Sequence, residues 1–196
     1  MLDSHLKPVQ VIVAYDFSPS AEEAVLRAIE LACRAPQHVL HVVAAIDVHT
    51  GLPILPPTGR VDYIYAERVE KLISERLVAA FAGRRTASEV QFYVHARIGK
   101  AADEILQVAE ELGADLILIG SHGKTGLERL VLGSVSERVV REAKCAVVVA
   151  RAKRYTDVEL AHVIQFEHDR QPYHPPHRYV YVDRRVLKRP AEWPIS

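Results

Sequence analysis

Residues 9–20 read VQVIVAYDFSPS, and this stretch decides the fold that we expect for the whole chain. The run Val9–Tyr15 is almost unbroken in apolar, largely β-branched residues, which is typical of a strand buried on both faces. Asp16 ends the run. Ser18 and Pro19 then open a helix, in which Ser20 and Glu23 have the spacing of a capping box. A buried strand followed at once by a helix is the repeating unit of parallel α/β sheets.

The same alternation continues to Ala150. Further strands are expected at Val39–Ile46, Glu89–His95, Asp115–Ile119 and Ala146–Ala150, and further helices at Tyr63–Phe81, Ala101–Leu112 and residues 134–143. This order predicts an α/β fold, a doubly wound five-stranded parallel sheet of the flavodoxin or Rossmann type. Such sheets bind ligands at the carboxyl ends of their strands, where the winding direction reverses. We therefore expect one α/β domain over residues 1–150 and a C-terminal extension over residues 151–196.

Composition and charge narrow the class of protein. Apolar residues make up 49% of the chain, charged residues make up 26%, and the formal net charge is zero. Residues 151–196 hold nine Lys and Arg against six Asp and Glu, so neither part is basic enough to predict nucleic-acid binding. No run approaches the roughly 18 apolar residues of a membrane span. Cys33 and Cys145 lack a CxxC spacing, as expected in a reducing compartment. The sequence predicts a soluble cytoplasmic protein with no membrane partner.

A glycine-rich segment follows the fourth expected strand. Gly120–Gly126 reads GSHGKTG, and the pair Gly133 and Ser134 begins the next helix. Glycines allow a ligand to approach backbone N–H groups, and a helix start attracts phosphate. Ser134 is expected to cap that helix, and Lys124 could add a positive charge. The alternative is a glycine-rich connection that binds nothing.

Other phosphate-binding and catalytic sites fit less well. A P-loop would need glycine at Leu118, and a receiver domain would need aspartate where Val94 and His95 stand. No Ser/His/Asp set is fixed by spacing, so no catalytic residue is predicted. Arg97 could reach an anion or be solvated. The best histidine cluster is held extended by prolines and has no cysteine, so no metal site is predicted; it comprises His162, His168, His174 and His177.

The spacing Gly120-x2-Gly123-x9-Gly133-Ser134 resembles the signature of ATP-binding universal stress proteins, and Val13–Ser18 is similar to that family's first strand with its acidic end. The resemblance covers about residues 8–150 and implies ATP, with or without Mg²⁺, as the ligand. The residues that it implies for nucleotide binding are Ala14, Asp16, Val43, Ile119, Gly120, His122, Gly123, Lys124, Gly133, Ser134, Val135 and Ser136.

Some of these residues keep a structural alternative. Asp16 is implied to contact the adenosine side, but an aspartate after a strand can also turn the chain or cap a helix. Ala14 stands where ATP-binding relatives often have proline, so this sequence departs from the family pattern at the wall expected for adenine. His122 could contact phosphate or face solvent.

The favoured function is that of an ATP-binding regulatory protein of the stress response. A slow ATPase is the first alternative, although nothing resembles a Walker B acid. A nucleotide-free module that binds an unknown protein partner through its C-terminal arm is the second. We expect a homodimer through the fifth strand, because an apolar edge strand is a pairing liability, and the family resemblance implies the same pairing. The arm is expected to form strands near 158–166 and 178–187 and to pack on the partner subunit.

Overall fold

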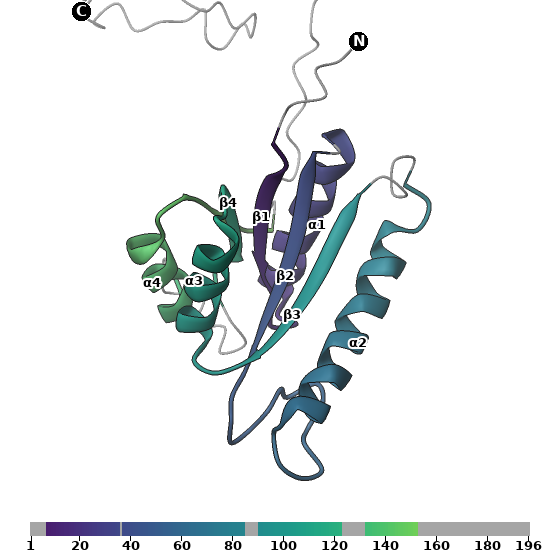
Figure 1. Cartoon of the computed structure of the whole chain (residues 1–196), viewed down its shortest axis with the longest axis vertical. Coiled ribbons are helices and arrows are strands. Elements are labelled where there is room, and N and C mark those ends of the chain that lie inside the picture. Colours follow the sequence, from purple (N-terminus) through teal and green to yellow (C-terminus); the bar gives the residue numbers. More distant parts are fainter. Residues whose placement is uncertain (1–6, 36, 85–89, 123–131, 153–196) are drawn as a thin grey trace, which may run out of the picture. The chain divides into compact units, whose positions relative to one another are not determined.

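The computed structural model describes residues 7–35, 37–84, 90–122 and 132–152. Its elements are β1 (Val9–Ala14), α1 (Pro19–Arg34), β2 (His38–Ile46), α2 (Tyr63–Phe81), β3 (Gln91–Ile98), α3 (Ala101–Leu112), β4 (Leu116–Gly120), α4 (Ser134–Glu142) and β5 (Ala146–Ala150). All strand pairs are parallel, in the order β3-β2-β1-β4-β5 (Figure 1). The predicted doubly wound sheet is confirmed. Residues 153–196 of the arm, with its expected strands and its histidines, lie outside the described residues.

Helices cover the two faces of the sheet in pairs. Alternate residues of β1 face opposite ways: Val11 and Val13 join the core beneath α1 and α2, while Ile12 and Ala14 join the core beneath α3 and α4. Figure 1 shows α1 and α2 on one side of the strands and α3 and α4 on the other. Because both faces of β1 are covered, its sequence has no polar alternation.

The start of α1 differs from the prediction. Ser18, not Ser20, is the N-cap, and its Oγ accepts a hydrogen bond of 3.2 Å from the Ala21 amide. Ser20 lies within the first turn, and its hydroxyl donates to the His122 carbonyl. The capping box at Ser20 and Glu23 was therefore wrong, because the serine two residues earlier already caps the helix. The third strand also continues to Ile98, beyond the predicted end at His95.

A polar cluster interrupts the sheet face near β2 and β3. His41 is 5% exposed. Its Nδ1 lies 3.0 Å from Nε2 of His95, and its Nε2 lies 2.8 Å from Oε1 of Gln10. The ring of Tyr93 stacks on His41 with centroids 5.2 Å apart. Burial, and after it the charge of His95, lowers the pKa of His41 to about 4.

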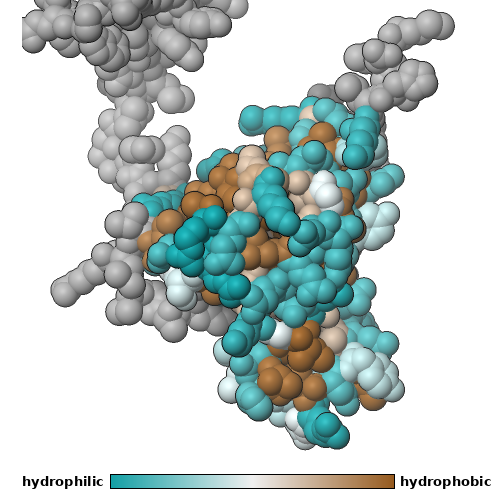
Figure 2. Space-filling view, turned by 60° about the vertical axis from the view of Figure 1, so that its left-hand side comes forward, coloured by the Kyte–Doolittle hydropathy of each residue, from teal (hydrophilic) through white to brown (hydrophobic). Residues whose placement is uncertain are grey.

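The outer surface of the described residues is mixed in character. Figure 2 shows two apolar areas on the side that carries α3 and α4, separated by hydrophilic side chains. Arg138 of α4 forms an ion pair of 2.5 Å with Asp103 of α3 across this side. None of the described helices is long and apolar enough to cross a membrane.

Candidate functional site

A pocket of about 170 Å³ opens at the carboxyl ends of β1, β2 and β4, next to the starts of three helices. The winding direction reverses here, because β2 follows on one side of β1 while β4 lies on the other. The residues that line it are Ala14, Tyr15, Asp16, Ser18, Ala21, Val43, Ala45, Ala101, Ile105, Ile119, Gly120, His122, Gly133, Ser134, Val135 and Ser136.

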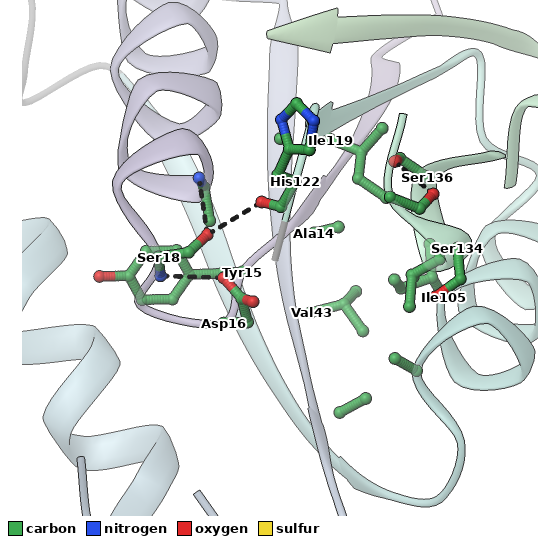
Figure 3. A pocket seen from close by; sticks show the side chains of 16 residues that line it. Ala14, Tyr15, Asp16, Ser18, Val43, Ile105, Ile119, His122, Ser134 and Ser136 are labelled. Carbon is green, nitrogen blue, oxygen red and sulfur yellow. Dashed lines mark hydrogen bonds between the residues drawn. The ribbon is translucent and has the colours of Figure 1, made fainter. Parts of the chain in front are cut away.

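The apolar and polar groups that line the pocket lie in different parts of it. In Figure 3, Ala14 and Val43 lie in the middle of the pocket. Asp16 and Ser18 lie on one side of them, and Ser134 lies on the other. The middle is therefore suited to a flat apolar group, and the two sides are suited to polar groups at either end of a ligand.

On the side of the pocket next to α1, the polar groups form hydrogen bonds with one another. One oxygen of Asp16, Oδ1, accepts a bond of 2.9 Å from the Ser18 amide, and Ser18 in turn caps α1. One first-turn amide of α1, that of Ala21, thus already has a side-chain partner. The structural alternative for Asp16 is confirmed in part, because this carboxylate does support the turn. Its second oxygen has no hydrogen bond among those resolved for the described residues, so Asp16 can serve the turn and a ligand together.

The side next to α4 has no such cap. Gly133 is the N-cap of α4 and makes no side-chain cap bond. The expectation that Ser134 caps this helix was wrong, because Ser134 is its first helical residue. The Ser136 hydroxyl donates to carbonyls instead, to Gly133 at 2.9 Å and to Ser121 at 3.2 Å.

Helix α3 begins at the same pocket, with Lys100 as its N-cap and again no side-chain cap bond. Two helix starts therefore present N–H groups and positive dipole ends toward one cavity. This arrangement suits an anion, and phosphate above all.

Backbone hydrogen bonds join the residue after β4 to the N-cap of α4 and to the end of β5. The Gly133 amide donates to the Ser121 carbonyl at 2.8 Å, and the Ser121 amide donates to Ala150 at 3.0 Å. A Cβ on Gly120 would lie 2.7 Å from the carbonyl carbon of Ser20, which is α1 backbone. Glycine is therefore required at 120 by the protein itself, whether or not a ligand binds.

Charge in the pocket comes mainly from one group. Among the described lining residues Asp16 is the only carboxylate, and none is lysine or arginine. Arg97 does not line the pocket; its side chain is 33% exposed and pairs with Glu111 and, at 3.7 Å, with Glu104 of α3. Across the described part of the chain, no group of three or more metal-ligand side chains occurs.

All predicted site residues that the structure describes line this one pocket. Gly123 and Lys124 lie outside the described residues. Sequence reasoning missed Ala45, Ala101 and Ile105, which extend the apolar lining. The start of the predicted helix 101–112 was a usable signal for Ala101, because that helix follows the carboxyl end of a strand.

The chain is similar in sequence to proteins of one family. A model of the Universal stress protein family matches residues 10–151. Universal stress protein MJ0531 of Methanocaldococcus jannaschii is 35% identical over 151 residues, which are 72% of this chain and 81% of the relative. YxiE of Bacillus subtilis, also a universal stress protein, is 31% identical over 150 residues, 72% of this chain and 98% of the relative. A universal stress protein solved in complex with cAMP has a TM-score of 0.52 at 24% identity, covering 76% of this chain and 100% of that one.

Proposed function

Because the chain belongs to the universal stress protein family, we propose that it is an ATP-binding regulatory protein of the stress response, whose nucleotide occupancy controls its conformation or its choice of partner. The observation that carries this proposal is the segregation of the pocket, with a carboxylate on one side, an apolar middle and two uncapped helix starts on the other.

Each part of ATP has a matching group. An adenine ring fits the apolar lining around Val43 and Ile105. The ribose hydroxyls can donate to Asp16, whose carboxylate is held in place by the Ser18 amide. The phosphates can accept from the N–H groups at the start of α4. A relative of the same fold has been solved with cAMP, another adenine nucleotide, which supports the same class of ligand.

Regulation without rapid turnover follows from the same residues. Hydrolysis needs a group that positions or deprotonates water. Asp16 is the only carboxylate among the described lining residues; one of its oxygens accepts from the Ser18 amide, and the other is taken by the ribose hydroxyls in the proposed complex. We therefore expect ATP to be retained largely unhydrolysed through purification. Sustained turnover that disappears in Asp16→Ala would instead establish a slow ATPase.

The proposed setting is a cytoplasmic homodimer. β5 is an edge strand, and Val148 on it is 45% exposed. An exposed apolar edge is a template for pairing, and a second copy of β5 would satisfy it. We propose that the arm at residues 151–196 adds to this interface.

Titration calorimetry with ATP and GTP tests the ligand. We expect ATP to bind at least about tenfold more tightly than GTP. Asp16→Ala should weaken ATP binding about 10- to 100-fold, as for a lost hydrogen bond to a charged group. Asp47→Ala is the matched control, because Asp47 accepts turn bonds of 2.9 and 2.8 Å from the His49 and Thr50 amides away from the pocket. Equal losses in the two variants, or no ATP binding by the parent, would contradict the proposal.

A further inference from the structure

The turn that carries Asp16 has an unfavourable backbone conformation. Phe17 has φ +65°, the one positive value among described residues other than glycine. Bulky side chains rarely adopt this region, so such a turn persists only where its surroundings hold it. Phe17 lies between Asp16, which lines the pocket, and Ser18, which caps α1. Whatever holds Phe17 therefore also fixes the direction of the Asp16 carboxylate.

A side chain from a distant helix contacts this turn. Arg76 of α2 places its Cζ 5.1 Å from the centroid of the Phe17 ring. The Tyr15 ring packs on Phe17 with centroids 4.6 Å apart and an interplanar angle of 50°. Phe17 thus lies between an aromatic ring and a guanidinium, both of which attract its π-system.

The same guanidinium is fixed by two further bonds. Arg76 Nη1 donates to Glu22 at 2.7 Å and to the Tyr15 hydroxyl at 3.3 Å. The Tyr15 hydroxyl also donates to Glu22. Burial, and then the bond to Glu22, raises the pKa of Tyr15, so this hydroxyl stays protonated and donating at neutral pH. We call these four residues, Arg76, Tyr15, Phe17 and Glu22, the Arg76 clamp.

The clamp is poorly placed to stabilise the whole fold. The side chains of Arg76 and Glu22 are 45% and 41% exposed, and ion pairs at that exposure add little to global stability. Its contacts instead converge on one turn, and Arg76 itself does not line the pocket. Figure 3 shows the Tyr15 ring on the far side of Asp16 from Val43, so the clamp contacts the turn from the side away from the apolar middle of the pocket.

We propose that Arg76 is a positioning residue for the nucleotide pocket, which holds the Phe17 turn and so keeps Asp16 directed at the ligand. This inference rests on the proposed function and adds to it a dependence of nucleotide affinity on α2. Without Arg76 the turn spends less time in its binding-competent form. The apparent dissociation constant rises in proportion to that loss of population.

Calorimetric titration with ATP, using Arg76→Ala, is the first test. We expect binding about five- to tenfold weaker, the range for one cation–π contact and one hydrogen bond. Arg76→Lys keeps the charge and should recover most of the affinity. Arg27→Ala is the matched control, because Arg27 is also 45% exposed and pairs with Glu23 and Glu30 on α1. Both alanine variants should unfold at nearly the same urea concentration.

A double-mutant cycle tests the route through Phe17. Phe17→Gly accepts a positive φ without strain but removes the ring that Arg76 contacts. In that background Arg76→Ala should cause no further loss of affinity. A loss as large as in the parent background would overturn the role of Phe17, and unchanged ATP binding by Arg76→Ala alone would overturn the clamp while leaving the proposed function intact.

The nucleotide-free protein gives a readout that does not depend on ATP. The Ser18 amide, which donates to Asp16 at 2.9 Å, reports on the turn in a ¹H–¹⁵N spectrum. We expect its resonance to shift in Arg76→Ala and not in Arg27→Ala. If the parent bound no ATP, the proposed function would be wrong. This shift would still support the positioning role, and its absence would overturn that role.

Discussion

Lowering the pH should destabilise this protein through the pair formed by His41, which is buried, and His95, which is partly buried. Gln10 Oε1 can only accept, so Nε2 of His41 carries a proton and Nδ1 accepts from Nε2 of His95. The pKa of His41 is lowered from 6.5 to about 4, and burial with the charge of Arg97 lowers that of His95 as well. The unfolded chain therefore binds more protons than the folded one below pH 6.5. Stability is complete above that pH and is lost as the pH falls toward 4.

The size of the effect follows from the shift. For a single group moved from 6.5 to 4, linkage gives about 2 kcal/mol of lost stability between pH 7.5 and pH 5. Tyr93, which covers His41, is 54% exposed, so water reaches one side of the pair and about 1–2 kcal/mol is the expected loss.

Urea unfolding followed by circular dichroism at the two pH values measures this loss. His41→Gln keeps a polar side chain but cannot titrate, so its stability should depend less steeply on pH than that of the parent. His49→Gln, at an exposed loop position, is the control and should retain the full dependence. The reasoning would be refuted if the parent and His41→Gln lost the same stability on acidification.

Three further predictions concern the pocket and the sheet edge. Gly120→Ala should destabilise the fold by about 1–3 kcal/mol in urea unfolding, because its Cβ would meet the α1 backbone at 2.7 Å. Gly59→Ala, with open space around its Cβ, should not. Ser134→Glu should stabilise α4 by about 0.3–1 kcal/mol yet weaken ATP binding, because its carboxylate competes with phosphate for the helix start. Ile64→Glu adds the same charge in the first turn of α2 and should leave ATP affinity unchanged. Equal ATP affinity in the two variants would show that the start of α4 does not bind the phosphates. Val148→Lys on β5 should convert a dimer to a monomer in light scattering, whereas Tyr93→Lys on the opposite edge strand should not.

Much of the fold could be predicted from the sequence, because most buried strands are nearly unbroken apolar runs and the longer helices have a clear apolar stripe. The bounds of α2 and α3 were predicted to the residue. β3 was harder, because its polar residues at 95 and 97 resemble a strand end. Their polarity is explained by tertiary contacts with His41 and with α3, which no local pattern reveals.

The location of the site was predicted well, because sheet topology determines it. The hydrogen bonds around the site were predicted poorly, because they depend on side-chain geometry. The rule that ligands bind where winding reverses brings Ala14 and Gly133 to one pocket. Ser18 caps α1, whereas the Ser20 hydroxyl donates to the His122 carbonyl, which is more than 100 residues away in the chain and which no local pattern reveals. The Arg76 clamp has no sequence signal at all, since arginine on an exposed helix face is ordinary.

The hydrogen bond between the Gly133 amide and the Ser121 carbonyl brings together the two ends of the segment that joins β4 to α4. The Ser136 hydroxyl adds a second bond to that same carbonyl. Once two points of a chain are held together in this way, doubling the number of residues between them costs only about 0.6 kcal/mol of chain entropy. Insertions and deletions within 123–131 should therefore alter which ligand is bound, and how tightly, while leaving the α/β core almost as stable as before.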